Sequence, residues 1–113
     1  MSDIEVKGLI RKYRPNIKDI TIENYSKYLN KISLYFKDEK FNVKDIDMFK
    51  KTKDVMKYLK ELPLSTQKAL IASILVILNN DDKYETSIKK YRKYLEVVNT
   101  SYELERSKKQ KNI

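Results

Sequence analysis

The chain has 113 residues with one Gly, two Pro and no Cys or His. That suits a single domain but not a sheet protein, whose tight turns need more Gly and Pro. No disulfide and no thiolate or imidazole metal site can form, so we expect neither metal nor cofactor. The net charge of +9 favours a polyanionic partner, with nucleic acid first, an acidic membrane surface second and acidic proteins third.

Helical patterns account for most of the first 62 residues. A short pattern over residues 4–13 ends at Pro15, because the residue before a proline avoids helical geometry. A strong amphipathic helix then runs from Asp19 or Thr21 to Phe36. Two shorter helices over residues 44–49 and 52–62 follow, and Pro63 ends the second one. In the amphipathic helix the apolar face is Ile22, Tyr25, Tyr28, Leu29, Ile32, Tyr35 and Phe36, and the polar face is Glu23, Asn24, Lys27, Asn30, Lys31 and Ser33.

Residues 64–78, LSTQKALIASILVIL, are apolar on every face after a polar first turn. Such a helix has no face suited to water, so it is predicted to be the buried centre of the domain. In its first turn Ser65 is expected to cap the backbone, while Thr66, Gln67 and Lys68 point donors outward, where the helix dipole favours an anion such as DNA phosphate. The apolar run is half the length of a bilayer span and no apolar signal segment precedes it, so we expect a soluble intracellular protein without a membrane partner.

The last helix begins after the turn at residues 79–82 and carries a seven-residue repeat. Its seam is spaced by four, three, four, three and four residues, as in a coiled coil. The seam predicts either a homodimer or packing of the helix back on its own bundle. The seam residues are Tyr84, Ile88, Tyr91, Leu95, Val98 and Tyr102. The pattern fades at Glu105, so residues 1–104 are predicted to form the domain and residues 105–113 a frayed or disordered basic tail.

The order of these elements resembles a known family over residues 20–80. The resemblance rests on Thr21, Tyr25, Leu29 and Phe36 in the amphipathic helix, on Tyr58, Leu59 and Leu62 in the short helices, and on Leu64, Ser65, Lys68, Ala69, Ala72 and Ile77 in the central helix. This pattern is similar to the N-terminal core-binding domain, a SAM-like helical bundle, of phage-type tyrosine recombinases and integrases. A large DNA virus is one source that the resemblance leaves open.

The resemblance implies DNA contacts from two places. One is the polar face of the amphipathic helix, at Asn24, Lys27 and Lys31, and the other is the start of the central helix, at Ser65, Thr66, Gln67 and Lys68. The chain departs from the recombinases because it contains no His and none of its nine tyrosines lies in a recognisable catalytic motif. Strand cleavage is therefore not implied.

Basic residues concentrate near the C-terminus, where residues 83–113 carry nine basic and four acidic groups. The predicted DNA contacts in this region are Lys89, Lys90, Arg92 and Lys93 on the helix and Arg106, Lys108 and Lys109 in the tail. A solvated helix face is the alternative for each cluster, and an AT-rich coding sequence would also produce many lysines.

The remaining candidates for chemistry are aromatic rings and carboxylates. Tyr25, Tyr28, Tyr35, Tyr58, Tyr84 and Tyr91 fall on apolar stripes and are predicted to lie in the core, which leaves Tyr13, Tyr94 and Tyr102 as exposed rings. Carboxylate pairs such as Asp45 and Asp47 lack a partner base, so no catalytic residues are predicted. We therefore expect an all-α domain, a compact bundle of four or five helices around the central helix with a long C-terminal helix. Its expected function is non-enzymatic, largely sequence-independent binding of double-stranded DNA through phosphates. The alternative is a structural or protein-interaction module that dimerises or docks through residues 84–102.

Overall fold

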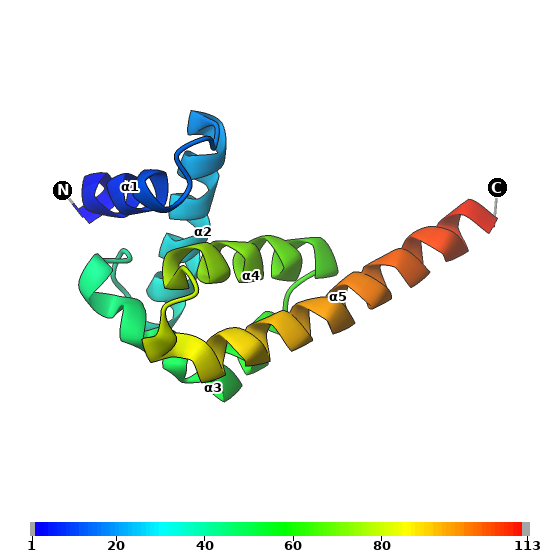
Figure 1. The fold of residues 1–113 in the computed structure, drawn as a ribbon. Helices are drawn as coiled ribbons and strands as arrows, with labels where there is room; N and C mark the ends of the chain where they lie inside the picture. Colours follow the sequence, from blue (N-terminus) through cyan, green and yellow to red (C-terminus); the bar gives the residue numbers. More distant parts are fainter. Residues whose placement is uncertain (1, 112–113) are drawn as a thin grey trace.

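The protein is an all-α bundle with a long C-terminal helix, as the sequence predicts (Figure 1). The structure is a computed structural model that describes the backbone of residues 2–111 and the side chains of residues 4–105. No strand occurs within that described backbone. In chain order the elements are α1 (Ser2–Tyr13), α2 (Asp19–Lys37), the 3₁₀ helix η1 (Val43–Lys50), α3 (Thr52–Leu59), α4 (Leu64–Leu78), the 3₁₀ turn η2 (Asp82–Tyr84) and α5 (Glu85–Lys111).

Helix α4 is the centre of the bundle, which confirms its predicted position. It packs against α1, α2, η1 and α5, and its buried side chains are Gln67, Leu70, Ile71, Ser73, Ile74, Val76, Ile77 and Leu78. The helix ends where Asn79 adopts the left-handed conformation and donates its backbone N–H to Leu75. The predicted cap at Ser65 is wrong, because the N-cap is Pro63, which provides no side-chain cap, and Ser65 already lies inside the helix.

The predicted dimer seam on α5 is used within the chain itself. Tyr84, Ile88, Tyr91 and Val98 are buried in the core, and Leu95 packs partly buried against it, because α5 lies along α4 and crosses α3 (Figure 1). The Tyr91 hydroxyl donates to the backbone carbonyl oxygen of Phe49 at 2.5 Å. The seam thus packs back on its own bundle, one of the two predicted alternatives, and a dimer through Tyr84, Ile88, Tyr91 and Val98 would require the bundle to open.

Helix α5 is also longer than predicted. Its backbone stays helical to Lys111, whereas the sequence pattern predicts fraying from residue 105. Beyond the seam, which ends at Tyr102, the helix extends past the rest of the bundle (Figure 1). The backbone of its last turns does not pack against α4.

The apolar stripe of α2 is rotated relative to the prediction. Its buried residues are Ile22, Ser26, Leu29, Ile32 and Ser33, so two serines belong to the buried face. Tyr35 lies about 200° around the helix from Ser33 and is 55% exposed, with Phe36 beside it at 37%. The prediction that Tyr35 lies in the core, and that Ser33 lies on the polar face, is therefore wrong.

Candidate nucleic-acid interface

Three adjoining hollows lie along α3 and form the candidate site, which we call the α3 groove. The first has a volume of about 160 Å³, the second about 340 Å³ and the third about 330 Å³. The first two share Lys51 and Asp54, and the last two share Thr52, Lys53 and Lys90. The complete lining is Phe36, Lys37, Met48, Lys50, Lys51, Thr52, Lys53, Asp54, Val55, Met56, Lys90, Lys93, Tyr94 and Val97.

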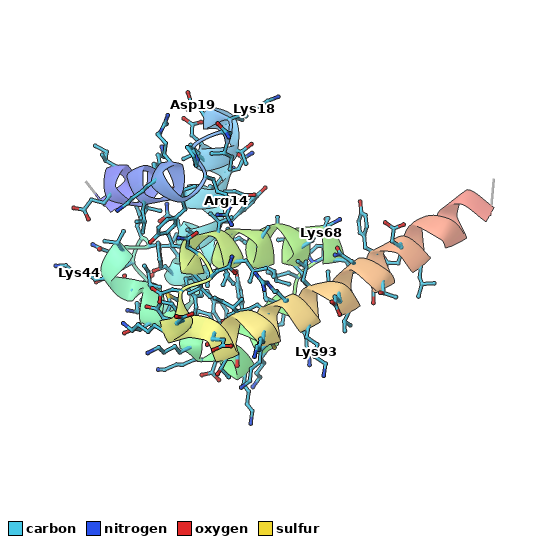
Figure 2. All side chains as sticks on the ribbon, in the orientation of Figure 1. Arg14, Lys18, Asp19, Lys44, Lys68 and Lys93 are labelled. Carbon is cyan, nitrogen blue, oxygen red and sulfur yellow. The ribbon has the colours of Figure 1, made fainter. Side chains whose placement is uncertain are left out.

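The local structure explains why these lysines meet. Thr52 begins α3 with its side chain buried, which leaves Lys51 and Lys53 on either side of it exposed. Lys90 and Lys93 are three residues apart and so share one face of α5, the helix that packs across α3. In Figure 2 Lys93 points away from α4, on the outer side of α5.

The groove carries positive charge that the rest of the described chain does not neutralise. No carboxylate of the described residues lies within ion-pair distance of Lys51, Lys53, Lys90 or Lys93, and Asp54 is the acidic residue in the lining. Two other lysines of the lining are partly neutralised by acidic partners. Lys37 contacts Asp45 at 2.7 Å and Lys50 lies 3.9 Å from Asp47.

The four basic residues predicted on α5 do not act as one cluster. Lys90 and Lys93 line the α3 groove. Lys89 instead pairs with Glu85 at 3.2 Å, and the Arg92 guanidinium donates to the side-chain oxygen of Asn80. Both face a separate hollow that also contains Asp82 and Glu85, so the structure divides the predicted cluster in two.

Sequence patterns missed the other half of the groove. Lys50 ends η1, Lys51 connects it to α3 and Lys53 lies in the first turn of α3, so in the sequence these lysines look like an ordinary solvated junction between two short helices. The density of lysines in this run is the one sequence feature that could have indicated a binding site. No sequence pattern shows that the run packs beside Lys90.

A second groove, of about 650 Å³, lies where α1, α2 and the start of α4 meet. It brings together Lys27 and Lys31 from α2 with Thr66 from α4, three of the predicted DNA contacts. Lys7 from α1 adds a basic side chain and Glu23 adds an acidic one. The other lining residues are Ser26, Tyr28, Asn30 and Leu34.

The remaining predicted contacts at these two helices are dispersed. Asn24 and Ser65 are exposed but do not line the second groove. Lys68 is exposed at the first turns of α4 (Figure 2), and its ammonium lies 5.2 Å from the centre of the Tyr102 ring on α5. Such a cation–π contact holds Lys68 toward α5 rather than toward Lys27 and Lys31.

Gln67 does not point its donors outward as predicted, because its side chain is buried and bonded within the chain. Its side chain is only 6% exposed. The amide nitrogen donates to the carbonyl oxygen of Leu62 at 2.7 Å, and the amide oxygen accepts from the Tyr94 hydroxyl at 2.7 Å. Gln67 shares the buried face of α4 with Leu70, Ile71 and Ile74, so it connects the turn after α3 and the middle of α5 to the central helix.

The predicted contacts in the C-terminal tail, a metal site and a membrane span are the remaining features to consider. Arg106, Lys108 and Lys109 lie outside the residues whose side chains are described. Within the described part of the chain, no group of three or more acidic, His or Cys side chains is placed to hold a metal ion. No helix there is long and apolar enough to cross a membrane.

A scan against protein-family models finds no match, and searches of curated proteins and of solved structures find none either. The likeness of residues 20–80 to the recombinase core-binding domain therefore rests on the pattern of residues alone.

Proposed function

We propose that this protein is a non-enzymatic DNA-binding domain that holds the phosphate backbone largely without regard to sequence. The observation that carries the proposal is the convergence of Lys51, Lys53, Lys90 and Lys93 on the α3 groove without a carboxylate partner. These lysines come from segments about 40 residues apart in the chain, so the fold and not a local run brings them together.

The form of the site favours a polymer over a small anion. A single phosphate needs one focus of donors, whereas these ammonium groups border a row of adjoining hollows. A row of cations along a groove matches the repeated charge of a nucleic-acid backbone, and its binding releases the counterions held there.

The side chains in the groove also favour binding without base reading. No Arg of the described chain lines it, and Arg is the residue that most often reads guanine through paired hydrogen bonds. Lysine is a mobile point charge that suits phosphate contacts. The resemblance to the core-binding domain favours the same class of ligand, and the second groove, with Lys27 and Lys31, offers a further contact for it.

A titration of labelled DNA, read by fluorescence polarisation at low salt, tests this function. The site variant changes Lys51, Lys53, Lys90 and Lys93 to Gln. The matched control makes the same change of charge at exposed lysines that line neither groove, namely Lys12, Lys18, Lys40 and Lys44.

We expect the site variant to lose about 100-fold in affinity at roughly 0.1 M salt, because the contribution of four phosphate contacts disappears. The control variant should lose only a few-fold through the lower net charge. Absence of DNA binding by the unaltered protein, or an equal loss in both variants, would overturn the proposal.

A further inference from the structure

Apolar side chains form part of the α3 groove between its lysines, and phosphate binding does not explain them. At one end Phe36, Met48 and Val55 line the first hollow, and at the other Met56, Tyr94 and Val97 line the third. Val97 is 58% exposed, although apolar groups on a surface gain nothing from contact with phosphate oxygens. The ligand of this groove should therefore offer apolar faces as well as charge.

Phe36, the aromatic residue that lines the first hollow, belongs to a cluster of rings with Tyr35 and Tyr58. Tyr35 stacks on Tyr58 with ring centres 4.0 Å apart and planes inclined by 27°, and Phe36 meets Tyr35 edge-on at 4.9 Å. Tyr58 covers one face of the Tyr35 ring and holds it in place, while Tyr35 as a whole stays 55% exposed. A rigid ring with an uncovered face is the element that proteins use to stack an unpaired base.

Duplex and single-stranded DNA present different groups to a basic groove lined with aromatic and apolar side chains. A duplex presents phosphates and sugars outward and keeps the faces of its bases stacked inside. A single strand presents phosphates and base faces together, so its backbone can follow a basic groove while its bases lie on aromatic and apolar side chains.

We propose that the α3 groove binds single-stranded DNA, with phosphates on Lys51, Lys53, Lys90 and Lys93 and a base stacked at Tyr35 and Phe36. This inference rests on the proposed function and narrows its ligand from DNA in general to an unpaired strand. It replaces the duplex that the sequence pattern favours as the preferred partner.

The test uses the whole chain with a labelled 20-nucleotide oligothymidine and with a labelled 20-base-pair duplex, in separate titrations at one salt concentration. The variant is Tyr35→Ala with Phe36→Ala. The matched control removes two exposed apolar side chains that lie outside the groove, Ile4→Ala with Ile20→Ala.

We expect the unaltered protein to bind the single strand at least tenfold more tightly than the duplex. The aromatic variant should lose about 30-fold for the single strand, since each stacked base contributes through one ring, and less than twofold for the duplex. The control should bind both as the unaltered protein does. Tyr35→Leu, which keeps an apolar side chain but removes the ring, should lose roughly fivefold for the single strand.

Preference of the unaltered protein for the duplex, or single-strand binding that Tyr35→Leu and the double variant leave unchanged, would overturn this inference while leaving the proposed function intact. Failure of the unaltered protein to bind either form would overturn the proposed function itself. Quenching of tyrosine fluorescence by oligothymidine gives an independent reading, and this quenching should be smaller in Tyr35→Leu.

Discussion

The salt dependence of binding follows from the number of lysines in the α3 groove that have no acidic partner. Lys51, Lys53, Lys90 and Lys93 provide four such charges. With a slope of about −0.7 per phosphate contact on a single strand, the logarithm of affinity should fall with the logarithm of salt concentration with a slope of about −2.8. A rise from 50 to 200 mM NaCl should therefore weaken binding about 50-fold.

Removing half of these charges should halve the slope. We expect Lys90→Gln with Lys93→Gln to bind with a slope of about −1.4, so that the same rise in salt weakens binding only about sevenfold. The assay is polarisation of labelled oligothymidine at four salt concentrations and constant pH, with Lys12→Gln and Lys18→Gln as the control pair. A slope shallower than about −1 for the unaltered protein, or the same slope in the Lys90 and Lys93 variant, would refute the assignment of phosphate contacts to this groove.

Two further predictions concern the stability of the fold. The free energy of unfolding of the Ser33→Ala variant should exceed that of the Ser73→Ala variant by about 1 kcal/mol, measured by urea unfolding followed by circular dichroism. Both serines are fully buried in helices, but the Ser33 hydroxyl has no partner whereas the Ser73 hydroxyl donates to Leu70 at 2.7 Å; a destabilised Ser33→Ala would contradict this reasoning. Burial and the hydrogen bond to Asp47 raise the pKa of Tyr84 from 10.0 to about 12. Its contribution is therefore complete below pH 10 and is lost as pH rises toward 12. Between pH 9 and 12 the melting temperature of the Tyr84→Phe variant should fall less steeply than that of the unaltered protein. The same pH profile in both proteins would count against the hydrogen bond between Tyr84 and Asp47.

The centre of the fold was predictable because burial leaves a clear pattern. An apolar helix bounded by Pro63 and Asn79 has one possible place in a small bundle, and α4 occupies it. Buried polar residues leave no such pattern. Side-chain chemistry predicts that Ser33 and Gln67 face water, yet each lies on the buried face of its helix. Only the packing of neighbouring helices decides which polar residue is covered.

The candidate site depended still more on tertiary structure. The second groove joins Lys27, Lys31 and Thr66, which the sequence had indicated as two separate sites. The α3 groove joins a run near residue 50 with half of a cluster near residue 90. Helical periodicity shows which residues share one helix face, but not which face of another helix lies beside it.

The tyrosines show why composition alone could not distinguish a core residue from a binding residue. The hydroxyls of Tyr84, Tyr91 and Tyr94 on α5 and its preceding turn all donate to groups of the same chain, and a buried tyrosine needs such a partner. Tyr35 instead stacks its ring on Tyr58 and stays 55% exposed, and in our proposal that ring contacts the ligand. A coding bias can raise the number of Lys and Tyr in a protein, but it does not select their neighbours. The half-exposed Tyr35 ring contacts Phe36, which lines the first hollow together with Lys51. This arrangement is a stronger ground for proposing a nucleic-acid ligand than the net charge of the chain.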